Sequence, residues 1–478
     1  MTHEFPHPVI DADGHLQEFT NLLRNDILAE ALETGGPSLA ARVERNPALT
    51  IDEFMRTGWY VMTEEERRDQ WIPCPAWWGQ PVVTVDRAAS YLPAFLYQRL
   101  DELGIDLTVL YPSLGLTLGF IDDPDVRRLA CRVYNRTYGA MYEPYGDRMI
   151  PVAVIPMVTP DEAVDALDCA VGELGFKAIV IHHVRRPVPL VEREGPQFAR
   201  YAQRLETYGI DSDYDYDLFW ARCAQLGVAV GVHASEQSWG SRRSPTRYAY
   251  NHIGAFAAAA DSICKSIFMD GVTRRFPELN FAFLEGGVGW ACTQLSDLVG
   301  HWEKRGGAHV EALNPEHLDV DGLLELVDAY GTDAMKANRG LVEEFFRRPE
   351  HRANELDDWR RCKISSRSDF KDLFVDRFYF GCEADDPINA WAFHTELNPL
   401  GEKLKILFSS DIGHWDVPDM ARIVDEAFEL VEHGLITEGD FRAYVFTNPV
   451  DLYVQGRPDF FAGTHVAGAV DAHRATAA

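Results

Sequence analysis

Val9-Ile10-Asp11-Ala12-Asp13-Gly14-His15, near the start of the chain, has the pattern of a short buried strand that ends in polar residues. Side chains alternate along a strand, so Asp13 and His15 face the same way, and Gly14 allows the backbone to pass closely. A carboxylate oxygen beside an imidazole nitrogen forms half of a site for a divalent metal. The alternative is a strand that simply runs into a polar turn. The choice depends on whether later strands end in matching ligands.

Seven further apolar runs follow, each bounded by turn residues and separated by helical patterns. The runs are near-continuous rather than alternating, which is typical of strands buried on both faces of a parallel sheet. Eight strand–helix units predict an α/β fold, a (β/α)8 TIM barrel, with a doubly wound open sheet as the alternative. The predicted strands are 8–12, 105–111, 149–155, 177–182, 228–233, 279–284, 377–381 and 404–409, and the predicted helices are 125–143, 160–175, 215–226, 291–304 and 418–434.

Two long segments interrupt this repeat within a barrel that we expect to span residues 1–461. Residues 16–104 separate the first two strands, and residues 302–376 separate the sixth and seventh. Both are expected at the catalytic end of the barrel, where long insertions form lids or substrate walls. The first is rich in Trp, Trp77 among them, and is either a ligand surface or a satellite core. Residues 462–478 are expected to form a flexible tail.

The composition limits the classes of function. The 478 residues include 45 basic and 75 acidic side chains, a formal net charge of -30, which disfavours nucleic acids and anionic membranes as partners. No apolar run reaches about 18 residues, and the N-terminus lacks the pattern of a signal peptide. Eight scattered cysteines without a C-x-x-C pair favour reduced thiols. We expect a cytoplasmic enzyme with a small-molecule substrate.

Polar residues follow most of the predicted strands, at the end where such barrels carry out catalysis. Burying so many of them without a counter-ion would cost several kcal/mol each, and a divalent metal removes that cost. One of His182 and His183 must face the barrel mouth, because neighbours on a strand alternate. The candidates are Asp13, His15, Tyr111, His182, His183, His233, Glu285 and Asp411.

Four motifs carry a family resemblance. D-x-H (13–15), G-V-H-x-S (231–235), F-P-x-L-x-F-x-x-x-E-G-G-V-G-W (276–290) and F-S-S-D-x-x-H (408–414) resemble the amidohydrolase superfamily, above all the branch named for aminocarboxymuconate-semialdehyde decarboxylase. The resemblance implies that His15, His233 and Asp411 bind metal, with Asp13 where the family often has His or Glu. It also implies a homodimer. Decarboxylases of the branch have a His general acid at the position of Glu285, so this departure weakens the decarboxylase hypothesis.

We therefore expect a metal-dependent hydrolase that activates water to cleave an amide, ester or thioester bond of a small, bulky apolar or aromatic substrate. Asp411 is the expected base and then acid, assisted by Glu285 and His252. The expected substrate contacts are Tyr111, His182, Arg185 and Trp77, although Arg185-Arg186 is equally compatible with a surface salt bridge.

The number of metal ions is open. The site is expected to take one or two ions of Zn, Mn or Fe, the second held by Glu285, His233 and His183. The alternative is that Glu285 only orients His233. Non-oxidative decarboxylation of an aromatic or unsaturated carboxylic acid is the alternative reaction, and a non-catalytic ligand-binding barrel is a remote third possibility.

Overall fold

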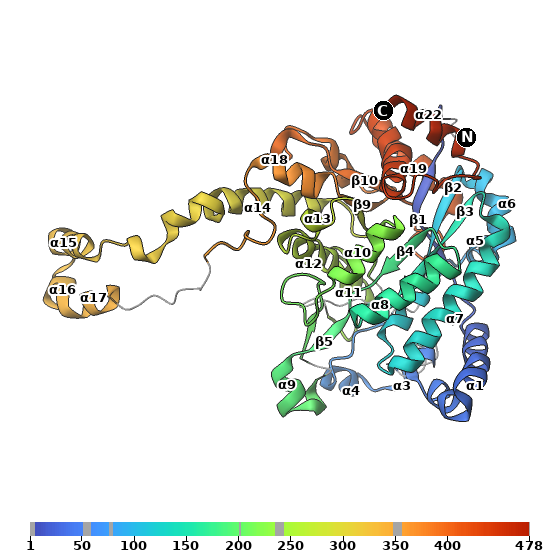
Figure 1. Ribbon diagram of the computed structural model, residues 1–478, viewed down its shortest axis with the longest axis horizontal. Helices are drawn as coiled ribbons and strands as arrows, with labels where there is room; N and C mark the ends of the chain where they lie inside the picture. Colours follow the sequence, from blue (N-terminus) through green and yellow to red (C-terminus); the bar gives the residue numbers. More distant parts are fainter. Residues whose placement is uncertain are drawn as a thin grey trace.

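Eight parallel strands form a nearly closed barrel with helices between them (Figure 1). The computed structural model describes residues 5–50, 59–75, 80–199, 202–234, 243–347 and 356–477. The strands pair in the order β1-β2-β3-β4-β7-β8-β9-β10, so the predicted TIM barrel is confirmed. They are β1 (Ile10–Leu16), β2 (Leu107–Pro112), β3 (Met149–Ile155), β4 (Ala178–Ile181), β7 (Val230–Val232), β8 (Phe281–Phe283), β9 (Phe378–Glu383) and β10 (Lys405–Ser409).

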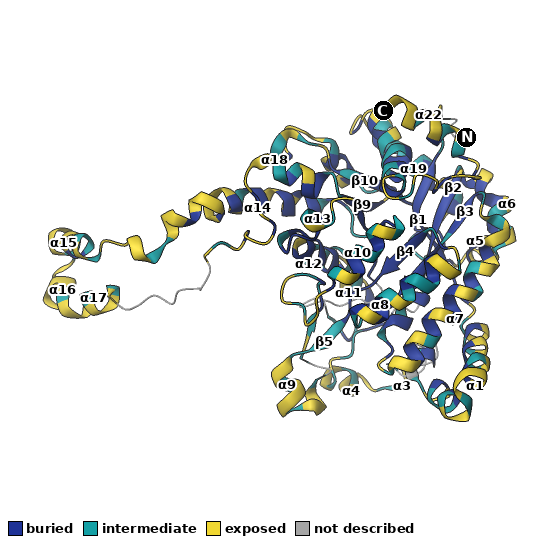
Figure 2. Cartoon of the chain, viewed as in Figure 1, coloured by how far each residue is buried: buried dark blue, intermediate teal, exposed yellow. Residues whose placement is uncertain are grey.

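The barrel strands are buried because helices cover their outer face (Figure 2). Two of these helices show why they begin where they do. In α7 (Pro124–Tyr142) and α8 (Pro160–Leu167), Pro occupies the first turn, and the side chains of Asp123 and Thr159 accept backbone N–H groups. The other covering helices include α6 (Pro93–Leu103), α10 (Asp217–Leu226), α12 (Ala255–Met269), α14 (Gly289–Arg305), α19 (Ile423–Glu432) and α21 (Asn448–Val454).

Strands β1 and β10 stand at the two ends of the strand order, and a seam of hydrogen bonds joins them. His15 N donates to Ile412 O at 2.9 Å, and Asp411 N donates to Asp13 O at 3.1 Å. Below them, the buried Asp11 carboxylate accepts from Thr108 Oγ1 at 2.6 Å and from Ser410 Oγ at 2.8 Å. This seam sets Asp13, His15 and Asp411 side by side.

The segment between β1 and β2 reaches the carboxyl ends of the strands. Cys74 N donates to Ser244 O at 2.8 Å, and Asn251 Nδ2 donates to Cys74 O at 3.1 Å, so this segment contacts the chain that follows β7. Trp77 lies outside the described residues. The helices of the described part are α1 (Thr20–Glu44), α3 (Trp59–Val61), α4 (Glu64–Asp69), α5 (Thr84–Tyr91) and α6.

Residues 307–347, which we call the arm, project away from the barrel (Figure 1). The expectation that residues 302–376 wall the catalytic end is wrong for this part, because the arm follows the C-terminus of helix α14 rather than the carboxyl end of a strand. Most of its surface is exposed (Figure 2). The arm contains the 3-10 turns Gly307–Leu313 and Pro315–His317 and the helices α15 (Val320–Tyr330), α16 (Asp333–Ala337) and α17 (Arg339–Phe346).

The end of the chain is more ordered than its composition suggests. Helix α22 (Ala467–Ala477) forms where a flexible tail was expected. Val466 and Val470 are buried, and His473 Nε2 lies 3.2 Å from Asp451 Oδ1 on α21. The buried valines and the contact between His473 and Asp451 hold this helix against the body of the protein.

All eight cysteines are free thiols, and seven of them are buried. This agrees with the reduced thiols that the sequence predicts. Within the described ranges, no helix is both long and apolar enough to cross a membrane.

Candidate metal centre

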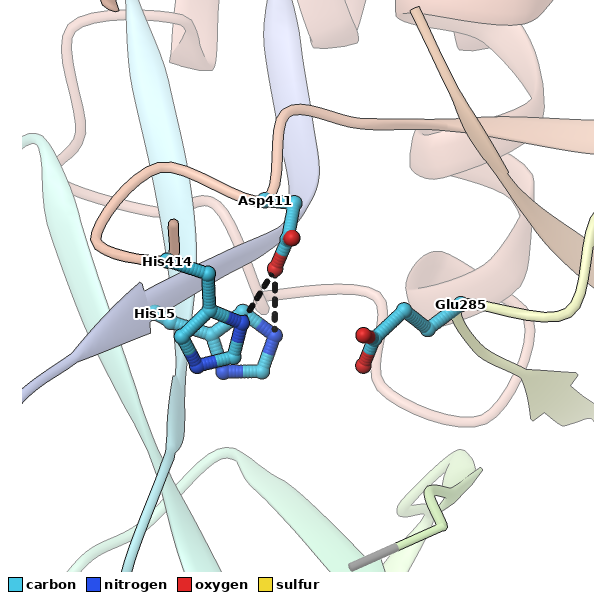
Figure 3. A group of neighbouring side chains, drawn as sticks. All are labelled: His15, Glu285, Asp411 and His414. Carbon is cyan, nitrogen blue, oxygen red and sulfur yellow. Dashed lines mark ion pairs between the residues drawn. The ribbon is translucent and has the colours of Figure 1, made fainter. Parts of the chain in front are cut away.

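Two candidate ligands stand in a backbone conformation that side chains rarely adopt. Glu285, after β8, has φ 56°, and Asp411, after β10, has φ 51°. Such left-handed residues cost about 1–3 kcal/mol each and cluster at functional sites. The turns bring both carboxyl groups to the barrel mouth, where Figure 3 shows Asp411 above the rings of His15 and His414 and Glu285 to one side of them.

Ligand-type atoms gather in two groups that share His15. Asp13, His15 and His233 each offer an atom within 4.8 Å of the others, and His15, Glu285, Asp411 and His414 do the same. The Asp411 carboxylate points at both imidazoles, with Oδ1 at 2.6 Å from His414 Nδ1 and 3.4 Å from His15 Nε2 (Figure 3). His15 is therefore the centre of the arrangement.

A third group extends the site outward. His252, Glu285 and Asp416 again offer atoms within 4.8 Å of one another. Glu285 belongs to this group and to the group around Asp411, and its Oε2 lies 2.9 Å from His233 Nε2. Glu285 thus links the inner ligands to the more exposed pair of His252 and Asp416.

The inner atoms suit a divalent cation because they are buried and lack hydrogen bonds. Among the described residues, five buried ligand atoms of the site have no hydrogen-bond partner. Several of these five atoms lie close to one another. Unsatisfied buried polar atoms cost about 1–3 kcal/mol each, and a bound cation would satisfy those that become its ligands. The atoms are Asp13 Oδ1, His15 Nε2, His233 Nε2, Glu285 Oε2 and Asp411 Oδ1.

Neighbouring groups orient two of the imidazoles. His233 Nδ1 lies 2.8 Å from Ala234 O and must donate to it, which leaves the Nε2 lone pair facing Glu285. His414 Nε2 lies 2.9 Å from Ser113 Oγ, whose hydroxyl already donates to Leu16 O. Ser113 therefore accepts from His414 Nε2, and the lone pair of Nδ1 faces the Asp411 carboxylate. Both rings present a free nitrogen to the same centre.

Burial dominates the electrostatics of the site. It raises the pKa of Glu285 to about 8 and holds the pKa values of Asp13 and Asp411 well above their usual range. Burial also raises the pKa of Asp416 to about 7 and lowers the pKa of His15. Without a cation the carboxyl groups resist ionisation, because each would place an unsolvated charge beside the others. A bound cation would reverse this preference.

Aromatic rings border the outer side of the site. The ring centroid of His252, on α11 (Tyr248–His252), lies 5.5 Å from Tyr248, 5.4 Å from Phe256 and 5.6 Å from Trp415. Phe256 also lies 6.0 Å from His233. We call Tyr248, Phe256 and Trp415 the aromatic wall, and it suits a flat apolar substrate.

Four residues predicted for the site lie outside the three ligand groups of the described residues. His182 is buried beneath Gly119, where a Cβ would come within 1.9 Å of its Nε2, and its ring contacts Phe120. His183 is buried and, within the described ranges, belongs to none of the three ligand groups. Tyr111 is buried under the ligands, 6.1 Å from His233 between ring centroids. Arg185 begins the short strand β5 (Arg185–Pro187), paired with β6 (Gln203–Leu205).

Three residues of the site were given no role from the sequence. His414 and Asp416 lie in the loop after β10, and Glu383 ends β9, where burial raises its pKa to about 7. The spacing Asp411, His414, Asp416 is a signal in the sequence, because a tight turn at Gly413 (φ 101°) returns these side chains to one place.

Comparison with known proteins places this geometry in a family. A family model described as amidohydrolase matches residues 10–454. The fold is similar to that of an amidohydrolase from Mycobacterium avium subsp. paratuberculosis K-10, with 18% identity, a TM-score of 0.52, and 94% of this chain and 98% of that chain covered.

Two further structures are similar at lower scores. 2,6-Dihydroxybenzoate decarboxylase from Rhizobium has 15% identity and a TM-score of 0.46, with 94% of this chain and 98% of that chain covered. Manganese-bound 5-carboxyvanillate decarboxylase from Novosphingobium aromaticivorans DSM 12444 has 12% identity and a TM-score of 0.49, with 94% and 97% covered. No curated protein matches the chain. The family model spans the barrel from β1 to α21 and includes every ligand named above, so the chain belongs to the amidohydrolase family.

Proposed function

We propose that the chain is a metal-dependent decarboxylase that removes the carboxyl group of a small aromatic or unsaturated acid without oxidation. The proposal rests on the position of the Glu285 side chain. Its carboxyl lies 2.9 Å from His233 and faces His15, Asp411 and His414 across the barrel mouth (Figure 3). The departure that weakened this hypothesis in the sequence thus puts an acidic group at the position where a proton donor is needed.

The residues divide into those that hold a cation and those that handle the substrate. His15 and Asp411, with Asp13, His233 and His414 around them, would hold a Zn, Mn or Fe ion. Such an ion would neutralise the carboxylate of the substrate and orient it. The aromatic wall would pack against the ring of the substrate.

The reaction requires the protein to donate one proton to the substrate. As the bond between the ring carbon and the carboxyl carbon breaks, carbon dioxide leaves and the electron pair stays on the ring carbon. Glu285 gives its proton to that carbon, which forms the new C–H bond. His252 and Asp416, whose side chains are 17% and 20% exposed, connect Glu285 with solvent and return a proton to it.

Hydrolysis remains a second candidate because His414, which Ser113 orients, lies against the Asp411 carboxylate. Ser113 Oγ lies 2.9 Å from His414 Nε2, and His414 Nδ1 lies 2.6 Å from Asp411 Oδ1. This arrangement supports Asp411 as a base that takes a proton from an attacking water and passes it to a leaving group. The substrate would then be an amide, ester or thioester.

The test is product analysis in deuterium oxide. Protein loaded with Mn or Zn is incubated with a panel of hydroxybenzoates and unsaturated acids, and with a panel of esters, thioesters and amides. We expect release of carbon dioxide and one deuterium on the carbon that lost it. Hydrolysis of the second panel without carbon dioxide from the first would overturn decarboxylation in favour of hydrolysis.

Glu285→Gln separates proton donation from metal binding. We expect a loss of at least 100-fold in kcat, because general acid catalysis contributes about 10²- to 10⁴-fold, while the metal content by elemental analysis stays unchanged. Glu278→Gln, at an exposed glutamate before β8, is the matched control and should retain full activity. If Glu285→Gln loses metal together with activity, Glu285 is a ligand rather than the acid.

A further inference from the structure

The arm carries apolar side chains that it cannot bury by itself. Its helices contact one another around Leu324, and Arg339 pairs with Asp328 at 3.0 Å. A segment of about 40 residues is too small to form a hydrophobic core of its own. Six large apolar side chains of the arm are 45–84% exposed, namely Leu313, Leu318, Leu326, Tyr330, Leu341 and Phe345.

An apolar groove lies on the body of the protein beside the root of the arm. It has a volume of about 950 Å³ and runs along α14 from Gly289 to Arg305, between α14 and α12. The arm begins at Gly307, two residues after the groove ends. Ile388 and Trp391 on its rim are 46% and 37% exposed. The large apolar residues that line the groove are Met269, Trp290, Leu298, Trp359, Ile388 and Trp391.

We propose that the arm of one copy of this chain docks into the α14 groove of a second copy, and that the exchange of arms forms a homodimer. The groove lies along α14 up to Arg305, and the arm continues the chain beyond the end of that helix, away from the barrel (Figure 1). A two-fold axis passing near that end would place each arm over the groove of the partner, so that both contacts form at once. Such reciprocal contacts are the usual basis of homodimers.

The exposed apolar surface is of the size that this contact needs. A stable interface buries about 800 Å² on each partner. Monomers rarely leave apolar patches larger than a few hundred Å² exposed. The arm and the groove together offer eight large exposed side chains, and each large aromatic among them buries about 150–250 Å² when it is fully covered. Two arms in two grooves meet the requirement.

The oligomeric state of the full chain tests the proposal. We expect a mass of twice 53.9 kDa by light scattering at about 10 µM protein, a concentration well above the Kd of an interface of this size. The arm variant Leu326→Glu/Leu341→Glu and the groove variant Ile388→Glu/Trp391→Glu should each run at 53.9 kDa. Val82→Glu, at a valine that is 84% exposed outside both surfaces, is the matched control and should remain dimeric.

Mixing the two variants identifies which surfaces meet. The arm variant keeps a normal groove, and the groove variant keeps a normal arm, so a heterodimer has one intact contact where each homodimer has none. We expect the mixture to recover a dimer that binds more weakly than the wild type. A mixture that stays monomeric would mean that arms pair with arms, which overturns the proposal.

Two other results would also overturn it. They are a wild-type chain that stays at 53.9 kDa up to about 100 µM, and variants that remain dimeric. Circular dichroism and metal content of each variant confirm that its barrel is intact. Mass, circular dichroism and metal content are measured without substrate. The test of the dimer is therefore independent of whether the proposed decarboxylation is correct.

Discussion

Ser113 decides which nitrogen of His414 faces the metal centre. Its hydroxyl donates to Leu16 O and accepts from His414 Nε2, which leaves Nδ1 for a cation. We expect Ser113→Ala to weaken the affinity for a divalent metal by about 10- to 100-fold, as is usual when the partner of a ligating histidine is lost. Competition with a chelating dye measures the affinity.

Two further variants complete this measurement. Ser113→Thr keeps a hydroxyl and should retain most of the affinity. Ser262→Ala removes a hydroxyl that donates to Ala258 O within α12 rather than contacting a histidine of the site, and should change nothing. An unchanged affinity in Ser113→Ala would show that His414 is not a ligand.

The residues of the site were predictable wherever a strand ends. Asp13, Asp411 and Glu285 directly follow apolar runs, and strand alternation fixes the direction of His15. Strand alternation does not predict the direction of His182, because β4 ends at Ile181. Beyond that point the backbone turns and places His182 under Gly119. His414 and Asp416 lie beyond β10 in a loop, where no periodicity tells which way a side chain points.

At the scale of elements, the end of β9 supports the turn that carries Glu285. A Cβ on Gly381 would lie 2.7 Å from Ser409 Oγ, 2.9 Å from Leu284 Cα and 3.1 Å from Glu285 N. We expect Gly381→Ala to destabilise the protein by about 1–3 kcal/mol through overpacking, and to lower kcat because Glu285 must move. Urea unfolding and the rate of carbon dioxide release measure the two effects.

Gly300→Ala is the control for that substitution. Gly300 lies inside α14, and none of the described atoms considered around it lies within 4 Å of a Cβ built there. Ala favours a helix over Gly by up to about 1 kcal/mol, so this variant should be as stable as the wild type or more so. Equal destabilisation by both changes would refute the steric explanation.

The elements themselves were easier to predict than their direction. Seven of the eight barrel strands lie within about two residues of their predicted bounds, because a run buried on both faces has few polar residues inside it. The exception is β1, which ends at Leu16, four residues beyond its predicted end, because its polar residues Asp13 and His15 lie within the strand. The arm was placed at the catalytic end because residues 302–376 were treated as one segment between the sixth and seventh strands. The helix predicted over 291–304 ends within one residue of α14, and the arm begins two residues after that helix.

At the scale of the whole molecule, the carboxyl groups of the site make stability depend on pH when metal is absent. Glu285, with a pKa of about 8, and Glu383 and Asp416, each with a pKa of about 7, keep protons in the folded state that the unfolded chain releases near pH 4 to 5. Between those limits the folded state binds more protons, so the free energy of unfolding falls as the pH rises.

Chemical unfolding between pH 4.5 and 8.5 checks this expectation. The metal-free protein should lose stability across the range, at about 1.4 kcal/mol for each pKa unit of a shifted group. The metal-loaded protein should vary much less, because the cation favours the ionised carboxylates, and Glu285→Gln should reduce the slope of the metal-free form. Parallel curves for the two forms would contradict a cation at this site.

The seam between β1 and β10 also sets the order of events during synthesis. Asp11 and Ser410 are 399 residues apart in the chain, yet their contact helps to close the barrel. A ribosome adds about 5–20 residues per second, so β1 leaves the exit tunnel roughly 20 to 80 s before its last neighbour exists. For that time the nascent chain holds Asp13 and His15 without Asp411 or His414. Metal loading is then a late event of biogenesis. A chain that stops before residue 411 lacks the ligands Asp411 and His414 and cannot form the complete metal site.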